Sequence, residues 1–388
     1  MIPRILEHKL RELATKFPVV SLTGPRQSGK TTLVRYVFSD YAYVSLEEPD
    51  TRLYATSDPR GFLNNYPDGL IIDEVQRVPE LFSYIQSLVD QSGKTGQFIL
   101  TGSQNFLLLE KISQSLAGRV AILKLLPFAI SELGKERIDQ ENYYQLLLDG
   151  FYPRLYDKQI TPEDYYPNYI QTYLERDVRQ IKNITDLNTF TRFIQLCAGR
   201  VGQLVNLSAL GQEAGITHST VKAWISLLEA SYILFLLYPH HRNFNKRLVK
   251  TPKLYFYDTG LVCSLLGITR SEQVPMHYLR GSLFENLVIA DIYKSFTNVG
   301  REAPITFWRD KTGHEIDLIV ESGNELHIYE IKSGQTISGD FFRELNYFNE
   351  LSGQTGQKST LVYGGDQDQQ RKAIQVKSWK SLVRNSPS

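Results

Sequence analysis

Several features that would point to particular classes of protein are scarce in this sequence. Its 388 residues include only two cysteines, Cys197 and Cys263, which lack metal-ligand spacing and are too few for a disulfide framework. The net charge of +1 indicates no global attraction to nucleic acid or membrane. The longest apolar run, 233–238, is too short to span a bilayer, and the N-terminus lacks the apolar core of a signal peptide. We therefore expect a cytoplasmic protein that does not enter the membrane.

What the sequence does contain begins with an ordinary globular composition, 42% hydrophobic and 22% charged, and a length that suggests two or three domains. Residues 18–23 are typical of a short buried strand, and residues 32–38 have helical periodicity. Between them, residues 24–31 read Gly-Pro-Arg-Gln-Ser-Gly-Lys-Thr. Such a loop between a strand and a helix is typical of phosphate binding, because successive backbone N–H groups turn inward onto the anion.

The residue types in this loop predict binding of ATP with Mg²⁺. Gly24 and Gly29 let the backbone curl, Lys30 reaches the β- and γ-phosphates, and Thr31 offers its hydroxyl to Mg²⁺. The residues expected to bind the nucleotide here are Gly24, Pro25, Arg26, Gln27, Ser28, Gly29, Lys30, Thr31 and Thr32.

Further short apolar runs predict a three-layer α/β fold with a mainly parallel sheet. These strands are expected at 43–46, 69–72, 97–100 and 120–125. The run at 69–72 leads directly into two acids, of which Asp73 is expected to hold Mg²⁺ and Glu74 to polarise the attacking water. Ser103, after the next strand, can bond the γ-phosphate or that water, with a plain turn as the alternative.

Two arginines are candidates for stabilising charge on the transferred phosphoryl group. Arg119 would reach a neighbouring subunit's nucleotide in trans, as an arginine finger in a homo-oligomer. Arg154 follows the core, where a helical lid is expected to begin. A surface ion pair is the alternative for each.

Residues 206–229 have the pattern of a helix-turn-helix, and 232–238 and 253–257 are expected to form the strands of a wing. Ser208 can cap the first helix, and Thr217 or His218 opens the second. Residues 176–258 hold eleven Lys and Arg but five Asp and Glu, an excess of +6 that suits contact with DNA phosphates.

Base-specific reading of DNA by this segment has little support, because the second helix is expected to expose few side chains that reach bases. These side chains are His218, Lys222 and Trp224. The alternative is a packing module beside the ATPase core.

The C-terminal third combines three acids and a lysine in a predicted helix and hairpin. The helix at 281–296 carries Glu285, and strands are expected at 305–309, 314–320 and 325–332. Glu330 and Lys332 point to one face of their strand, and Asp317 can lie beside them across the hairpin.

This group suits Mg²⁺-assisted cleavage of a phosphodiester, with a second Mg²⁺ or Mn²⁺ held by Asp317 and Glu330. A solvated strand face with alternating charges is the alternative reading.

These motifs together resemble a large prokaryotic family that pairs an AAA-type ATPase with a C-terminal domain of unknown function 4143. The resemblance is carried by the segments at 24–31, 71–76, 100–103, 116–119, 152–155, 253–261, 281–286 and 308–309. It implies an additional-strand sheet, in which the strand of Thr101 lies between the loop strand and the strand of Asp73.

The resemblance also implies an AAA-type P-loop NTPase followed by a winged helix and a restriction-endonuclease-like α/β domain. The expected domains are an ATPase core at 1–135, a helical lid at 136–182, a winged helix at 183–270 and a PD-(D/E)xK nuclease-like domain at 271–388. The nuclease pattern falls on Glu285, Asp317, Glu330 and Lys332, with Ile316 where the family pattern has proline.

The leading interpretation is an Mg²⁺-dependent ATPase whose nucleotide state controls a DNA-directed, nucleolytic C-terminal domain. The alternative is an ATP-gated switch or scaffold with a non-cleaving C-terminal domain that recruits a protein partner. The expected catalytic residues of the two sites are Lys30, Glu74, Arg119, Glu285, Asp317, Glu330 and Lys332.

Overall fold

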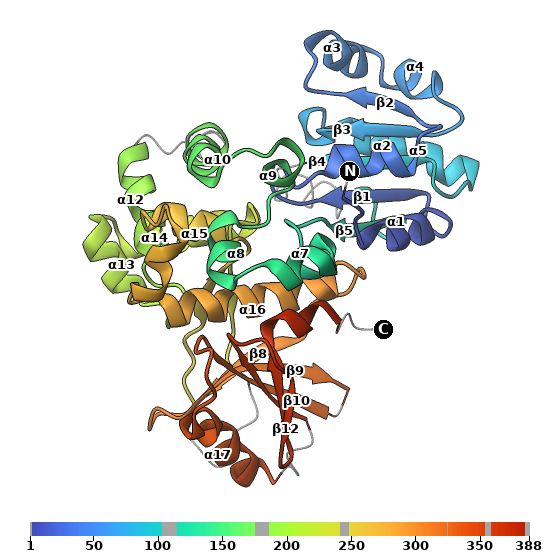
Figure 1. Ribbon diagram of the computed structural model, residues 1–388. Coiled ribbons are helices and arrows are strands. Elements are labelled where there is room, and N and C mark those ends of the chain that lie inside the picture. Colours follow the sequence, from blue (N-terminus) through green and yellow to red (C-terminus); the bar gives the residue numbers. More distant parts are fainter. Residues whose placement is uncertain are drawn as a thin grey trace. The chain divides into compact units, whose positions relative to one another are not determined.

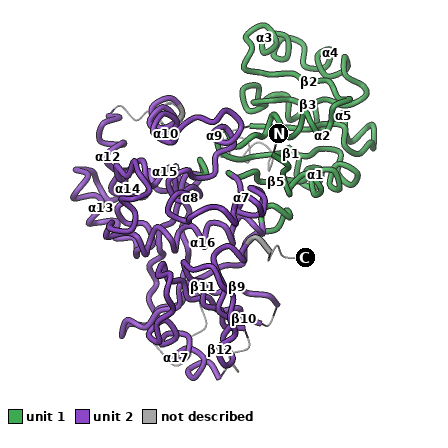
Figure 2. Tube along the Cα trace, viewed as in Figure 1, with its two compact units in different colours: residues 1–127, 230–232, 297–301 green, residues 128–229, 233–296, 302–388 purple. Residues whose placement is uncertain are grey.

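The computed structural model describes residues 2–102, 115–174, 186–240, 248–323, 325–353 and 358–384. The chain divides into two units, each taken by itself below (Figure 2). The first unit contains Met1–Pro127 together with two short later segments, Ala230–Tyr232 and Thr297–Arg301. The second contains Phe128–Glu229, Ile233–Phe296 and Glu302–Ser388.

The first unit is built on a five-stranded parallel sheet with the order β2-β3-β4-β1-β5 (Figure 1). Its strands are β1 (Val19–Thr23), β2 (Ala42–Ser45), β3 (Leu70–Asp73), β4 (Phe98–Gly102) and β5 (Val120–Lys124). All five predicted strands are present. The order confirms that the strand of Thr101 lies between the loop strand and the strand of Asp73.

Two hydrophobic cores flank this sheet because alternate strand residues face opposite sides. Leu70 and Ile72 of β3 pack into one core, and Ile71 between them packs into the other. The helices of this unit are α1 (Leu6–Ala14), α2 (Lys30–Val37), α3 (Pro49–Ser57), α4 (Pro59–Asn64) and α5 (Leu81–Ser92), with a 3₁₀ turn η1 (Val75–Arg77). The first core includes residues of α4 and α5, the second residues of α1 and α2. The unit therefore has three layers.

The second unit begins with short helices that pack through tyrosines. They are η2 (Ile130–Leu133), α7 (Lys135–Gln140), α8 (Tyr143–Asp149), α9 (Pro153–Lys158), α10 (Pro162–Tyr169) and the π-helical η3 (Ile170–Leu174). The buried hydroxyls of Tyr152 and Tyr169 lie 2.8 Å apart. Buried Asp258 accepts hydrogen bonds from the backbone N–H groups of Phe151 and Leu261, which ties these helices to the next segment.

The elements expected for the helix-turn-helix and wing are present, as α12 (Leu187–Ala198), α13 (Leu207–Ala214), α14 (His218–Ala230) and an antiparallel pair, β6 (Leu234–Leu237) and β7 (Lys253–Phe256). Two expected details are wrong. Asn206, not Ser208, caps α13 by accepting from the N–H of Ala209 at 3.0 Å. Trp224 is buried, because its ring packs edge-on against Phe190 of α12.

The C-terminal part contains a six-stranded sheet with the order β12-β13-β11-β10-β9-β8. Its strands are β8 (Ile305–Arg309), β9 (Glu315–Ser322), β10 (Glu325–Lys332), β11 (Ser359–Tyr363), β12 (Gln369–Arg371) and β13 (Ile374–Ser378). Strands β8, β9 and β10 are successively antiparallel, whereas β11 is parallel to β10 and to β13. The three strands expected here are thus confirmed.

The helices of this part are α15 (Thr259–Leu265), η4 (Ser271–Met276), α16 (Arg280–Thr297), η5 (Gly339–Phe342), α17 (Arg343–Ser352) and η6 (Trp379–Arg384). Leu345 and Phe348 of α17 pack against the sheet around Trp308. Across the described ranges, no helix combines the length and apolar character needed to cross a membrane.

Candidate functional site

The loop at 24–31 joins the carboxyl end of β1 to the start of α2, as the strand–loop–helix pattern predicts. Gly24 has a φ of 149° and Gly29 a φ of 92°, a region that L-residues rarely adopt. A Cβ atom on Gly24 would lie 2.1 Å from the carbonyl oxygen of Leu125. Glycine at position 24 is therefore required by both backbone conformation and space.

Lys30 lies across this loop. Its ammonium group donates hydrogen bonds to the carbonyl oxygens of Gly24 at 3.0 Å and Pro25 at 2.8 Å. Arg4, which the sequence did not single out, donates to the carbonyl oxygens of Ser28 at 2.8 Å and Leu126 at 2.7 Å. The loop is thus held from both sides by buried cations, and Lys30 is positioned within reach of any anion in it.

Asp73 is the centre of a hydrogen-bond cluster at the carboxyl edge of the sheet. Its Oδ2 accepts from the hydroxyls of Thr31 at 2.8 Å and Tyr43 at 2.9 Å. Its Oδ1 accepts from Thr101 and from the backbone N–H of Glu74. Burial and the charge of Asp73 raise the pKa of Tyr43, so that its hydroxyl remains a donor.

The strand register explains this convergence: Ser45, Asp73 and Thr101 are partners on adjacent parallel strands. Thr101 and Tyr43 were not predicted as site residues. Thr101 was detectable, because it follows a buried strand of the same sheet and so reaches the same edge. Tyr43 gave no such indication, since its position is an ordinary one within a strand.

Glu74 follows Asp73 with a left-handed backbone, φ 55°, that separates its side chain from the direction of the strand. The side-chain amide of Gln76 donates to Glu74 Oε2, and both residues are buried. Of the other residues expected to bind nucleotide, Thr32 is exposed on α2, and Ser103 lies outside the described residues.

Arg119 directly precedes β5 and forms a two-point ion pair with Asp90 of α5, at 2.5 and 2.9 Å. Val19, the first residue of β1, pairs with Val120, so Arg119 lies at the amino edge of the sheet. The phosphate-binding loop leaves β1 at the opposite edge. Five strand residues separate these edges by roughly 15 Å. Arg154 is exposed on α9 of the second unit.

The first unit also receives a side chain from the turn between α14 and β6. The hydroxyl of buried Tyr232 lies 2.9 Å from Thr23 Oγ1, immediately before the phosphate-binding loop. Tyr232 has a φ of 57°. Sequence reasoning had placed this tyrosine only at the start of a strand.

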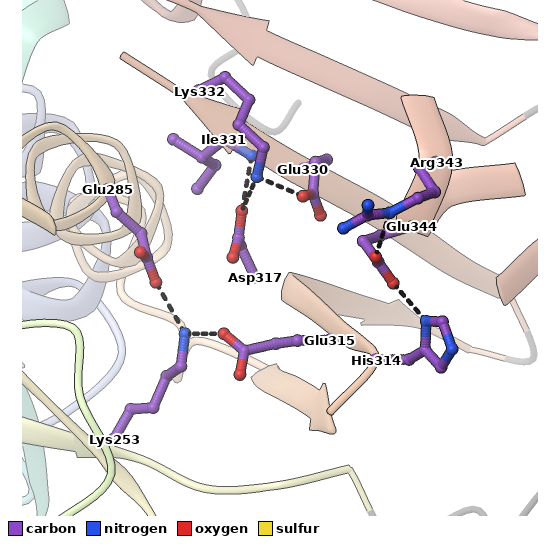
Figure 3. A network of polar contacts seen from close by, with 10 residues as sticks. All are labelled: Lys253, Glu285, His314, Glu315, Asp317, Glu330, Ile331, Lys332, Arg343 and Glu344. Atoms are coloured by element: carbon purple, nitrogen blue, oxygen red, sulfur yellow. Dashed lines mark hydrogen bonds and ion pairs between the residues drawn. The ribbon is translucent and has the colours of Figure 1, made fainter. Parts of the chain in front are cut away.

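The second candidate site lies in the C-terminal part and brings together all four predicted residues (Figure 3). Asp317 of β9 and Glu330 of β10 lie beyond the last registered pair of the hairpin, Leu318 with Tyr329. Lys332 Nζ lies 3.8 Å from Asp317 Oδ2 and also bonds Glu330 Oε1. The N–H of Ile331 donates to Asp317 Oδ2 at 2.8 Å.

Glu285, near the start of α16, joins this group through residues that the sequence did not reveal. Lys253 of β7 lies 2.9 Å from Glu285 Oε1 and also bonds Glu315 of β9 (Figure 3). Tyr255 donates its hydroxyl to Glu285 as well. Oxygen atoms of Glu285, Glu315 and Asp317 all lie within 4.8 Å of one another.

The electrostatics of this site are those of buried carboxylates beside buried ammonium groups. Burial raises the pKa of Glu285 to about 7, although Lys253 opposes the shift. Burial raises the pKa of Glu330 well above its usual range, and the charge of Asp317 adds to this. Burial disfavours the charged form of Lys332, but Asp317 and Glu330 outweigh it, and the pKa of the lysine is raised.

An all-oxygen carboxylate set fits a hard divalent cation such as Mg²⁺ or Mn²⁺. Glu330 strengthens this fit. The residue is only 2% exposed, yet its Oε2 atom has no hydrogen-bond partner within the described part of the chain. A buried carboxylate oxygen without a partner is costly unless a ligand completes it.

The parallel sheet, the phosphate-binding loop and the Asp73 cluster define a P-loop ATPase-like domain. Family models match the chain as an AAA domain over residues 16–134, a domain of unknown function (DUF8612) over 140–272 and a domain of unknown function (DUF4143) over 280–382.

Two curated relatives extend this match over most of the chain. The uncharacterized proteins Rv2008c of Mycobacterium tuberculosis and Mb2031c of Mycobacterium bovis are each 30% identical over 336 residues, covering 85% of this chain and 74% of theirs. The chain belongs to their family, which joins an AAA-type ATPase domain to a C-terminal DUF4143 domain. A Walker-type ATPase of Pyrococcus abyssi is 15% identical, covers 67% of this chain and 94% of its own, and has a TM-score of 0.45.

Proposed function

We propose that the first unit hydrolyses ATP with Mg²⁺. The observation that carries this proposal is the hydrogen-bonded set of Thr31, Asp73 and Thr101 beside the curled loop. In this proposal, Lys30 exchanges its bonds to loop carbonyls for phosphate oxygens, Thr31 and Asp73 hold Mg²⁺, and Glu74 orients and deprotonates the attacking water. Bound Mg²⁺ would neutralise charge on the β- and γ-phosphates.

Two substitutions separate binding from hydrolysis. Lys30→Ala is expected to abolish binding of a fluorescent ATP analogue, because the only ammonium group assigned to the phosphates is removed. Glu74→Gln is expected to retain binding within a few-fold and to lose turnover by roughly 10² or more, because it removes the general base. Unchanged thermal melting of both variants is the folding control. Wild-type turnover by Glu74→Gln would remove that residue from its assigned role.

We propose further that the nucleotide state controls a DNA-directed C-terminal domain of the restriction-endonuclease-like class. Support comes from the convergence of Glu285, Asp317, Glu330 and Lys332 in the order of the PD-(D/E)xK pattern. Asp317 and Glu330 would hold the metal ion, which would polarise the scissile phosphate and lower the pKa of a bound water. Lys332 would offset charge on that phosphate. Ile316 in place of the pattern's proline is a buried strand residue of β9.

The preceding helices and hairpin, α12 to β7, fit a winged helix that contributes DNA contact. His218 and Lys222 are exposed on α14, as a phosphate-contacting surface requires. Support for reading of individual bases is absent from this helix within its described residues, since Trp224 is buried.

Incubation with plasmid or single-stranded DNA in the presence of Mg²⁺ or Mn²⁺ tests the C-terminal proposal. Cleavage by the parent protein and loss of cleavage in Lys332→Ala, with ATP hydrolysis unchanged in both, would support it. Absence of cleavage with intact ATP hydrolysis would instead favour a switch whose C-terminal domain recruits a protein partner.

A further inference from the structure

The residue that this proposal leaves unexplained is Lys253. It is 2% exposed and projects from β7, outside the four-residue nuclease pattern. Its ammonium group lies 2.9 Å from Glu285 Oε1 and bonds Glu315 Oε1. The other oxygen of Glu315 is bonded by Arg309 at 3.0 Å. Burying an ammonium group in this way is costly unless the carboxylates around it need a cation.

The carboxylate oxygens around Lys253 have the spacing of a metal shell. Oxygens of Glu285, Glu315 and Asp317 lie within 4.8 Å of one another. Ligand oxygens around Mg²⁺, Mn²⁺ or Ca²⁺ lie at most about 4 to 5 Å apart across the ion, twice a metal–oxygen distance of about 2.1 to 2.4 Å. The geometry therefore accommodates a divalent ion, but an ammonium group holds two of the three carboxylates.

Asp317 divides the cluster into two sides. On one side it faces Glu330, whose buried Oε2 atom has no hydrogen-bond partner in the described part of the chain. On the other side it faces Glu285 and Glu315, which Lys253 joins (Figure 3). One side thus offers an oxygen to an incoming ion, and the other already contains a cation.

We infer that the Lys253 ammonium group takes the place of a second divalent cation, so that the C-terminal site accepts one metal ion, beside Asp317 and Glu330. This inference rests on the proposed C-terminal metal site. A metal ion on the Glu285 side would lie about 4 Å or less from the ammonium group, and repulsion at that distance in a buried site is strong. Lys253 cannot be displaced easily, because its stem is packed beneath the site and its ammonium lies 5.6 Å from the ring centre of Phe307.

The residue that limits the metal count comes from a different segment than the metal ligands. Lys253 lies within the matched range 140–272, whereas Glu285, Asp317 and Glu330 lie within 280–382. The cation content of the C-terminal site therefore depends on the hairpin strand β7, not on the C-terminal domain alone.

Titration of the full-length, nucleotide-free, EDTA-treated protein with Mn²⁺, followed by the electron paramagnetic resonance signal of free Mn²⁺, tests the inference. Lys253→Met is expected to bind one more Mn²⁺ per chain than the parent. The phosphate-binding loop is the same in both proteins, so it cancels in the difference. Lys253→Arg is expected to keep the parent stoichiometry, and the pair Lys253→Met with Glu315→Gln is expected to lose the additional ion.

Thermal melting provides the readout that shows whether a variant folds. In EDTA, Lys253→Met should melt below the parent because Glu285 and Glu315 lose their counter-cation, and Mn²⁺ should restore its melting temperature more than it raises that of the parent. Should Lys253→Met fail to fold, Lys253→Gln supplies a neutral side chain that can still donate to the carboxylates.

The outcomes separate this inference from the proposed metal site. Equal Mn²⁺ stoichiometry in the parent and the folded Lys253 variants, or a parent that binds two C-terminal ions, overturns the inference. One C-terminal ion in both proteins overturns it while leaving the proposed site intact. An ion bound only by Lys253→Met supports the inference but contradicts metal binding by Asp317 and Glu330 in the parent.

Discussion

At the scale of single residues, Asp291 is a carboxyl group buried in α16 away from both candidate sites. Its Oδ1 atom accepts a hydrogen bond from the backbone N–H of Ile130 at 2.6 Å. Burial raises its pKa from 3.8 to about 6, although this hydrogen bond and Lys294 oppose the shift. The folded protein therefore binds a proton at Asp291 more tightly than the unfolded chain does.

Asp291 predicts a stability change with pH whose sign is fixed by this shift. A pKa raised on folding gives stability that is complete below about pH 4 and is lost as pH rises through about 6. A shift of this size corresponds to roughly 2–3 kcal/mol in the free energy of unfolding. Asp291→Asn keeps an oxygen acceptor for Ile130 and should remove this dependence, as measured by melting of the second unit between pH 4 and 7.

The exposed Asp139 provides the matched control, since Asp139→Asn should leave the pH profile of the parent unchanged. If Asp291→Asn melts with the same pH dependence as the parent, another group controls stability in this range.

At the scale of elements, the start of α13 shows why a helix boundary is hard to predict from sequence. Asn206 and Ser208 are both good capping residues and are separated by one position. The choice between them is made by packing, since Leu210 and Ala214 are buried. Only one rotation of the helix buries these residues, and that rotation places Asn206 at the cap.

Asn206→Ala is therefore expected to lower the free energy of unfolding by about 1 kcal/mol, because the N–H of Ala209 loses its acceptor. Ser208→Ala, in the first turn of the same helix, is expected to change it little. Chemical denaturation of the two variants beside the parent measures both effects. A larger loss for Ser208→Ala would contradict the observed cap.

The strands and the phosphate-binding loop were predictable because their information is local. Residues 18–31 contain a buried strand, two glycines and a lysine in continuous order, and chain connectivity alone brings them together. The order of the strands is different. It depends on which buried faces pair, and the sequence indicated it only through its family resemblance.

At the scale of the whole molecule, Arg119 bears on assembly. It lies at the edge of the sheet opposite the phosphate-binding loop, so the role that we propose for it requires a second subunit. Its ion pair with Asp90 is exposed and should add little to stability. Arg119→Ala should therefore fold like the parent and lose ATP turnover by roughly 10³ or more if the residue acts as an arginine finger.

A mixture of variants tests action in trans. Lys30→Ala has no functional nucleotide site but retains Arg119, whereas Arg119→Ala has the reverse. Each alone should be inactive, and mixed oligomers should regain ATP hydrolysis. Lys30→Ala mixed with Glu74→Gln is the control, because no partner supplies the missing base. Parent-like turnover by Arg119→Ala alone would contradict the proposed role.

The sequence by itself determined the phosphate-binding loop, the acids at the end of β3 and the four residues of the C-terminal pattern, because each follows from a short motif on one or two elements. Only the tertiary structure decided that Tyr43 bonds Asp73 and that Lys253 joins Glu285 across 32 positions. These contacts depend on packing between separate elements, and a side chain's partners across such distances are set by which buried faces meet.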